Sequence, residues 1–198
     1  MTNLGKISKK IIHKTKKKKK NNKNNKIHYS ETYFKKVVIS TLASMKIVDH
    51  AVRGGDREIC GYMSGYIKDG IYYVLDAVEI PIIGTQSRVE IAGQMGDIAH
   101  EYTIKMLDVM KNVGREHSYI GWYHSHPGFN CFLSNVDENT QKMLQNIFKV
   151  FFALVVDPYK TISNRKVELG CFRCYKNERP NDSNAMALKK EVIQFNFK

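Results

Sequence analysis

The sequence predicts one α/β or α+β domain built around a single sheet and preceded by a charged tail. Strand-like and helix-like apolar patterns are intermixed along the chain without an internal repeat. The length of 198 residues suits one domain better than two, and apolar residues make up 42% of the chain, which is enough for a core. Most of the net positive charge lies near the N-terminus, outside the apolar patterns.

The predicted tail covers residues 1–36 and carries most of the net charge of +13. It contains thirteen lysines and one acid, whereas the other 162 residues carry 19 basic and 18 acidic side chains. The segment Lys14–Lys26 contains only Lys, Asn and Thr, so we expect it to be disordered. It suits a nuclear-import signal, loose contact with polyanions, or low-complexity padding. The nearly neutral remainder does not favour nucleic acid as a partner.

Three further observations limit the class of protein. The longest apolar run, Val150–Val156, has seven residues, far below the roughly 18–20 of a membrane span, so no membrane partner is expected. The basic N-terminus is not followed by an apolar stretch, so no secretory signal is predicted. Four cysteines do not indicate a disulfide scaffold, which favours an intracellular, reducing location.

The domain itself is expected over residues 37–176. A first helix is predicted where apolar residues recur at helical spacing before two glycines, at Leu42, Met45, Val48, Val52 and Gly54-Gly55. The segments Glu58–Ile67 and Ile71–Ile80 are strand-like and flank Lys68-Asp69-Gly70, which predicts a hairpin. Pro81–Gly96 is expected to be irregular.

A second helix is expected over Asp97–Val113, with Gly114 at its end. Its apolar stripe consists of Ile98, Tyr102, Met106, Val109, Met110 and Val113. The later elements are a strand at Ser118–His126, a helix at Ser134–Ile147, a strand at Val150–Val156, a polar turn, and a strand at Lys166–Tyr175. Residues 177–198 are expected to form a C-terminal extension that is polar at first and then weakly helical.

The stretch from Gly121 to Asp137 is the most informative chemically. His124 and His126 are two residues apart on a predicted strand, so both imidazoles point to the same face. Asp137 follows on the next helix. Two histidines and one carboxylate, with a fourth position left for water, form the ligand set of a catalytic zinc. Zinc lowers the pKa of its bound water to about 7, and Glu58 is a candidate for the base that takes the proton.

Each of these residues also has a plainer interpretation. Pairs of the form His-x-His occur on surface strands by chance, and Glu58 alone suits a solvated strand edge. Ser134 and Asp137 fit the capping box of the helix that begins there. Capping and metal binding are compatible, because a fixed helix start also aims Asp137. The spacing alone therefore supports a metal site and its absence about equally.

The complete pattern resembles the motif of the JAMM (MPN-plus) family. It comprises His124-x-His126-Pro127, then Ser134 and Asp137 at these intervals, and an upstream Glu58 in Glu-Ile-Cys-Gly-Tyr-Met-Ser-Gly. Gly121-Trp-Tyr before the histidines and Thr140-Gln141 after them also fit. The resemblance covers roughly residues 39–175. It implies an MPN/JAMM domain, whose central, mostly antiparallel, curved sheet is flanked by helices.

The resemblance also implies a zinc-dependent isopeptidase. One zinc ion per chain, with a bound water, would be held by His124, His126 and Asp137. Glu58 would be the general base, and Ser134 would stabilise the oxyanion as water attacks the isopeptide carbonyl.

Two branches of the family share this long motif, one in the signalosome and one in the proteasome lid. Gly84-Thr-Gln-Ser-Arg88-Val89 and Lys166-Val-Glu-Leu-Gly-Cys-Phe-Arg173 are similar to the signalosome branch, and Val136–Gln141 is similar to the lid branch. The first branch implies removal of a ubiquitin-like modifier from cullins (deneddylation). It also implies an MPN-family partner subunit in a multi-subunit complex, and a location in cytoplasm and nucleus. The alternative is a proteasome-lid-type deubiquitinase.

In the signalosome branch, the region that matches Thr85–Val113 is an insertion that gates the site. Thr85, Gln86 and Arg88 are therefore expected to gate the site or to bind the modifier. Gln86 stands where that branch has a glutamate that occupies the zinc at rest, and a neutral amide is a poorer ligand. Ala185–Phe197 is expected to be a remnant of the helices that anchor family members in their complexes.

Other classes fit less well. A non-catalytic MPN scaffold would have lost its ligands, but every ligand position is filled here. A cysteine hydrolase based on Cys131 lacks an evident orienting partner. Cys171-x-x-Cys174 lacks the second pair that a structural zinc site needs. A nucleic-acid-binding module would depend on the lysine-rich tail alone.

Overall fold

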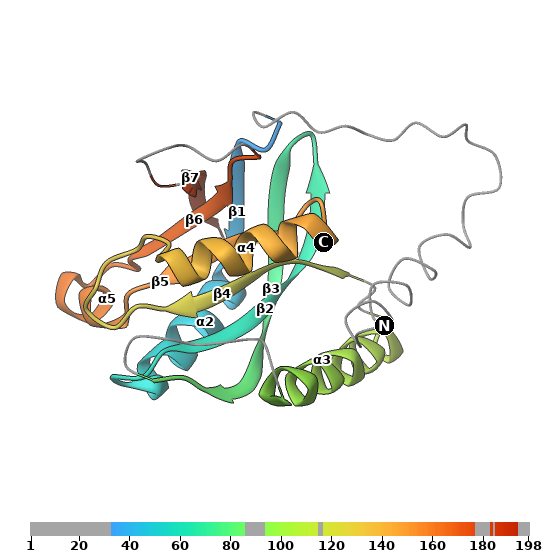
Figure 1. Ribbon diagram of the computed structural model, residues 1–198, viewed down its shortest axis with the longest axis horizontal. Coiled ribbons are helices and arrows are strands. Elements are labelled where there is room, and N and C mark those ends of the chain that lie inside the picture. Colours follow the sequence, from blue (N-terminus) through green and yellow to red (C-terminus); the bar gives the residue numbers. More distant parts are fainter. Residues whose placement is uncertain (1–32, 86–93, 115–116, 177–182, 184, 194–198) are drawn as a thin grey trace. The chain divides into compact units, whose positions relative to one another are not determined.

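The computed structural model describes residues 33–85, 94–114, 117–176, 183 and 185–193 (Figure 1). Its elements are β1 (Lys36–Ser40), α2 (Thr41–Gly54), β2 (Ile59–Lys68), β3 (Ile71–Ile83), α3 (Gln94–Asn112), β4 (Ser118–Ser125), α4 (Asn135–Ile147), β5 (Phe152–Val156), α5 (Pro158–Asn164), β6 (Leu169–Cys174), β7 (Ala185–Ala187) and β8 (Lys189–Ile193). The predicted tail over residues 1–32 lies outside these ranges. Within them, no helix combines the length and the apolar character needed to cross a membrane.

The described strands form one mixed sheet in the order β7-β6-β5-β4-β2-β3-β1-β8. Strand β2 runs antiparallel to both β3 and β4, and β6 runs antiparallel to both β5 and β7. The parallel pairs are β1 with β3, β1 with β8, and β4 with β5. The sheet is therefore mostly antiparallel with helices packed against it, which confirms the predicted fold class.

The two faces of the sheet are covered by different helices. Trp122 and Tyr123 are neighbours on β4, so their side chains point to opposite faces. Trp122 Nε1 donates to Gln141 Oε1 of α4 at 2.8 Å, whereas the Tyr123 hydroxyl lies 2.9 Å from His50 Nδ1 of α2. Helices α2 and α4 therefore lie on opposite sides of β4, as Figure 1 shows. Both faces of this strand are buried from Ile120 to Ser125.

The segment 185–193 corrects one prediction. A weak helix is expected from the sequence over Ala185–Phe197, but the described part of it forms strands β7 and β8. Only Leu188 separates these strands, yet β7 pairs with β6 and β8 pairs with β1, at opposite ends of the strand order. The Leu188 N–H donates to the Cys171 carbonyl at 2.8 Å. The two ends of the sheet therefore meet here, and the segment pairs with backbone groups that β1 and β6 would otherwise expose.

Helix α2 has the predicted span but turns a different face inward. The predicted apolar stripe is largely exposed, with relative exposures of 47% for Leu42, 65% for Met45 and 43% for Val52. The buried side chains are mostly small or polar: Ala43, Ser44, Ile47, His50 and Ala51. Apolar spacing thus locates the helix correctly but indicates the wrong inward face.

Two further features differ from the sequence prediction. Helix α5 occupies the predicted polar turn, and the Asp157 carboxylate caps it by accepting the Lys160 N–H at 3.0 Å. Phe34, in the predicted tail, is buried. It stacks on Tyr72 with ring centroids 5.0 Å apart, and the Arg173 guanidinium lies 4.3 Å from its ring. Packed structure therefore begins before residue 37, and the other domain boundaries stay predictions.

Gly61 on β2 provides a test of the packing beneath β4. A Cβ at this position would lie 2.3 Å from Tyr123 Cε1, so we expect Gly61→Ala to destabilise the fold by about 1–3 kcal/mol. Denaturant unfolding measures this change. In a Tyr123→Ala background the added methyl has room, so the same substitution should be far less destabilising there. Equal losses in both backgrounds would show that the Tyr123 ring is not the obstacle.

Candidate metal centre

The pairing of β2 with β4 brings the candidate site together. Their register places Cys60 opposite His124, so Glu58, which precedes Cys60 by two residues, lies at the level of His126. The Ile59 N–H donates to Ser125 Oγ at 3.1 Å and fixes this end of β2. On the other side, the His126 N–H donates to the Val156 carbonyl of β5 at 2.9 Å. Two neighbouring strands thus hold the end of β4, where the site lies.

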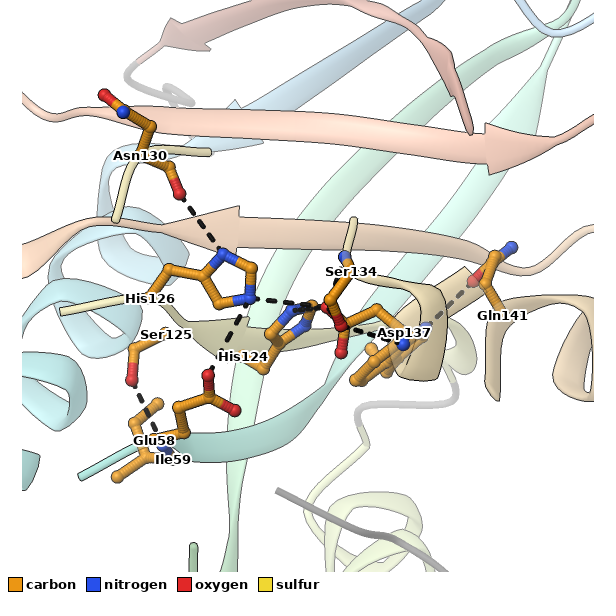
Figure 2. Close-up of polar contacts among 10 residues, drawn as sticks. Glu58, Ile59, His124, Ser125, His126, Asn130, Ser134, Asp137 and Gln141 are labelled. Atoms are coloured by element: carbon orange, nitrogen blue, oxygen red, sulfur yellow. Dashed lines mark hydrogen bonds and ion pairs between the residues drawn. The ribbon is translucent and has the colours of Figure 1, made fainter. Parts of the chain in front are cut away.

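Figure 2 shows the two histidines converging on Asp137. Asp137 Oδ2 lies 3.4 Å from His124 Nε2 and 3.3 Å from His126 Nε2. One ligand atom from each of the three residues lies within 4.8 Å of the others. All three side chains are buried, with at most 4% of each residue exposed. The structure therefore brings together the three residues that the sequence pattern singles out.

The start of α4 aims Asp137 at the histidines. Asp137 Oδ2 accepts the Ser134 N–H at 2.8 Å and the Ser134 hydroxyl at 2.6 Å, and Ser134 Oγ accepts the Asp137 N–H at 3.3 Å. This is the capping box that the sequence predicts. The Ser134 hydroxyl is therefore bonded to Asp137 in this structure, and it would have to turn away to contact a substrate oxyanion.

The ring of His126 is held in one tautomer. Its Nδ1 lies 3.2 Å from the Asn130 carbonyl, which can only accept, so the proton is on Nδ1. The lone pair of the neutral ring is then on Nε2, which faces Asp137. The ring also meets Phe132 edge-on, with centroids 4.9 Å apart. Fixing one ring nitrogen through a backbone carbonyl is typical of metal-binding histidines.

His124 is completely buried. Within the described residues, neither ring nitrogen has a hydrogen-bond partner of acceptable geometry, although Nε2 is near Asp137. The ring stacks on Trp122, with centroids 4.6 Å apart and planes at 16°. A buried polar atom without a partner needs an explanation. A cation beside Nε2 would supply one, and two imidazoles with one carboxylate form a donor set that zinc accepts. The three residues therefore fit a zinc ion.

The pKa values differ between the two histidines for physical reasons. Burial dominates at His124 and lowers its pKa. Burial also acts on His126, but the hydrogen bond and charge of Asp137, aided by Glu58, outweigh it and raise the pKa. Burial opposes the ionisation of Asp137, yet its contacts with both histidines and Ser134 lower its pKa far below the usual range. Asp137 is therefore ionised near neutral pH.

Glu58 is part of the buried site. It is 5% exposed, so the plainer interpretation of a solvated strand edge is wrong. Its Oε1 lies 3.9 Å from His126 Nε2. The Glu58 N–H donates to the Thr85 carbonyl at 2.9 Å, and the Gly84 N–H donates to the Glu58 carbonyl at 3.1 Å. Thr85 therefore adjoins Glu58, whereas Gln86 and Arg88 lie outside the described residues.

The cysteines do not form a second reactive site in the described part of the chain. Burial raises the pKa of Cys131 to about 11, so it is a thiol near neutral pH rather than a nucleophilic thiolate. Cys171 and Cys174 are buried and free, and burial raises their pKa values to about 12 and 11. These findings agree with the interpretation of ordinary buried thiols.

Three supporting residues are given no structural role by the sequence analysis. Gln141 accepts from Trp122 and donates to the Phe151 carbonyl at 3.0 Å, so it joins α4 to the sheet behind His124. Asn130 supplies the carbonyl that orients His126. Asp157 accepts from the backbone around Asn130. Gln141 is part of the family resemblance, and Asp157 followed by Pro is a helix-start pattern, but neither signal indicates these contacts.

Comparison with known proteins agrees with this fold and site. Residues 32–149 match the family described as JAB1/Mov34/MPN/PAD-1 ubiquitin protease. The chain is 42% identical over 164 residues to COP9 signalosome complex subunit 5 of Drosophila melanogaster, which covers 80% of this chain and 49% of that protein. It is 44% identical over 151 residues to COP9 signalosome complex subunit 5b of Arabidopsis thaliana, covering 76% of this chain and 41% of that protein. The chain thus spans less than half the length of each relative.

A solved structure supports the fold alone. The solution structure of a protein from Desulfitobacterium hafniense matches with a TM-score of 0.54 at 12% identity, over 80% of this chain and 94% of that one. The mixed sheet carries a buried cluster of two histidines and one carboxylate that could hold a metal ion. With the family match over residues 32–149 and the relatives above, the chain belongs to the JAB1/Mov34/MPN/PAD-1 family.

The opposite pKa shifts of the histidines can be tested in metal-free protein. NMR titration should show His126 ionising above the ordinary value of 6.5 and His124 below it. Asp137→Asn removes the main cause of the upward shift, so the pKa of His126 should fall. An unchanged His126 titration in Asp137→Asn would contradict the assignment of Asp137 as the cause.

The attraction between Asp137 and His126 also makes the stability of the fold depend on pH. The folded-state pKa of Asp137 is depressed and that of His126 is raised, so their attraction acts fully between the unfolded values of 3.8 and 6.5. The stability difference between wild type and Asp137→Asn should therefore be largest there. It should shrink as the pH rises through the folded pKa of His126, or falls through that of Asp137.

Proposed function

We propose that this chain is the catalytic domain of a zinc-dependent isopeptidase that removes a ubiquitin-like modifier from cullins, as the catalytic subunit of a signalosome. The main support is the buried cluster of His124, His126 and Asp137 with Glu58 beside it. The similarity of the chain to two COP9 signalosome complex subunits 5 adds to this support. The proposal extends to an MPN-family partner subunit in a multi-subunit complex, and to a location in cytoplasm and nucleus.

In this proposal, the three clustered residues hold one zinc ion through His124 Nε2, His126 Nε2 and an oxygen of Asp137. When bound, zinc supplies a Lewis acid that makes water a nucleophile near neutral pH. Glu58 takes the proton from the attacking water and later gives it to the leaving lysine amine. Its position supports this role, because Glu58 is buried and its Oε1 lies 3.9 Å from His126 Nε2, beside the proposed zinc ligands.

Ser134 would stabilise the charge that develops on the carbonyl oxygen. Its hydroxyl lies at the N-terminus of α4 and is bonded to Asp137, so a modest rotation would redirect its proton. Thr85, Gln86 and Arg88 would gate the site or bind the tail of the modifier. The backbone hydrogen bond from Glu58 to Thr85 supports this part of the proposal, since a movement of Thr85 would directly shift Glu58, the proposed base.

Incubation with neddylated cullin and with ubiquitin chains of defined linkage tests the function. We expect release of the modifier from cullin, loss of this activity with a chelator, and recovery on adding zinc. His126→Ala and Asp137→Ala should lose both the activity and the stoichiometric zinc measured by elemental analysis.

The other outcomes distinguish the alternatives. Cleavage of ubiquitin chains without action on cullin would indicate a proteasome-lid-type deubiquitinase. Stoichiometric zinc retained by both variants would exclude the proposed ligands. A zinc-loaded, folded protein inactive on every substrate, assayed with its complex partners, would favour a scaffold.

Glu58→Gln tests the proposed base. The amide keeps the size of the side chain but cannot accept the proton, so turnover should fall by about 10²–10⁴-fold while zinc content and thermal stability remain. Glu79→Gln is the matched control, because Glu79 contacts Arg53 and His50 on the α2 side of the sheet. Turnover near that of wild type in Glu58→Gln would mean that another group accepts the proton.

A further inference from the structure

Asp157 is a completely buried carboxylate between β5 and α5, outside the cluster of candidate ligands. Its two oxygens accept three backbone N–H groups. Oδ1 accepts from Gly128 at 3.1 Å and from Lys160 at 3.0 Å, and Oδ2 accepts from Asn130 at 3.0 Å. Capping α5 accounts for only the bond to Lys160. The other two bonds hold the loop that follows His126.

The loop of residues Gly128–Asn130 contains two residues with positive φ. Gly128 has φ 82° and Asn130 has φ 71°, both in the left-handed region. Glycine adopts this conformation readily, but for asparagine it is less favourable than the right-handed regions. The two loop residues whose N–H groups Asp157 accepts therefore both have unusual backbone angles. The Lys160 ammonium adds a hydrogen bond to Asn130 Oδ1 from the same helix.

The loop in turn fixes His126. Asn130 gives its N–H to Asp157 Oδ2 and receives the Nδ1 proton of His126 at its carbonyl. If Asn130 moved, His126 Nδ1 would lose its acceptor, and the proton would be free to move to Nε2. A protonated Nε2 has no lone pair for a metal. Through Asn130, Asp157 thus acts on the nitrogen that faces Asp137.

We propose that Asp157 is a positioning residue, which holds the Gly128–Asn130 loop so that His126 keeps its proton on Nδ1 and presents Nε2 as a metal ligand. This inference rests on the proposed zinc site. It assigns a function to Asp157 and to α5, which follows it. None of the hydrogen bonds described above joins them directly to His124, His126 or Asp137.

Asp157→Asn is the sharpest variant, because it keeps the shape of the side chain and replaces one acceptor oxygen with an NH₂ donor. Whichever way the amide turns, at least one of the three N–H groups loses its acceptor. We expect about 10–100-fold weaker zinc binding, the usual effect of removing a group that orients a metal ligand. Competition with a chromophoric chelator measures this affinity without any activity assay.

The tautomer of His126 is the second readout, since general destabilisation would not change it. In zinc-free protein at about pH 9, where imidazole is neutral, nitrogen NMR should find the proton on Nδ1 in wild type. In Asp157→Asn a substantial fraction should carry it on Nε2.

Asp76→Asn is the matched control. Asp76 is another buried carboxylate, on β3, where it accepts from the Ala77 N–H and pairs with Lys46. Its loss should lower the Tm without changing zinc affinity or the His126 tautomer. An equal loss of zinc affinity in both variants at matched Tm would overturn the proposal, as would wild-type affinity and tautomer in Asp157→Asn.

Zinc-free wild type gives a test that does not depend on any variant folding. The amide protons of Gly128 and Asn130 should be protected from exchange, because Asp157 holds them before a metal binds. Exchange at the rate of an unstructured peptide would overturn the proposal. Should wild type bind no zinc at all, the proposed function fails, while the tautomer and the amide exchange still decide whether Asp157 positions His126.

Discussion

The candidate site depends on one buried oxygen atom. Asp137 Oδ2 accepts both the backbone N–H and the hydroxyl of Ser134, and it lies within 3.4 Å of both histidine Nε2 atoms. The same atom therefore closes the N-terminus of α4 and faces the nitrogens that would share a metal. The three-residue step from Ser134 to Asp137 satisfies both demands, because the capping box needs that step and the cap aims the carboxylate. Helix start and ligand position cannot vary independently.

The antiparallel pairing of β2 with β4 is the second constraint. A slip of one residue in this register would turn Glu58 away from His126 and exchange the two faces of the strand. Gly61 lets the Tyr123 ring lie close against β2 in the present register. At the far edges, residues 185–193 pair with both β6 and β1, so the sheet is closed by a segment distant in sequence from the site. The packing of Tyr123 against Gly61, on the α2 side of the sheet, thus helps to fix the register that places Glu58 and His126 together on the α4 side.

Features set by neighbouring residues could be predicted from the sequence. The β2–β3 hairpin turns at Asp69 and Gly70, both with positive φ, and the cap at Ser134 lies where the pattern placed it. The strand assignment puts both histidines on one face. Features set by distant contacts could not be predicted from local patterns, and the approach of Glu58 to His126 was expected only from the family resemblance. Strands β7 and β8 form because they pair with the edges of β6 and β1. The hydrogen bonds from Gly128 and Asn130 to Asp157 join residues 27 to 29 positions apart, and no periodic pattern in the sequence indicates them. The apolar stripe of α2 indicated the wrong inward face, because mostly small residues and His50, rather than the large apolar residues of the stripe, face the sheet.

At the proposed metal site, the two histidines would differ in how strongly protons compete with a cation. Asp137 raises the pKa of His126, which makes Nε2 a stronger donor to a metal and also a stronger base toward a proton. Because a metal must displace that proton, the contribution of His126 to affinity falls as the pH drops below its folded pKa. Burial lowers the pKa of His124, so its Nε2 remains available at lower pH but offers a weaker base. As the pH falls, protons therefore compete with a cation at His126 before they do so at His124. The unequal burial and hydrogen bonding of the two rings cause this difference.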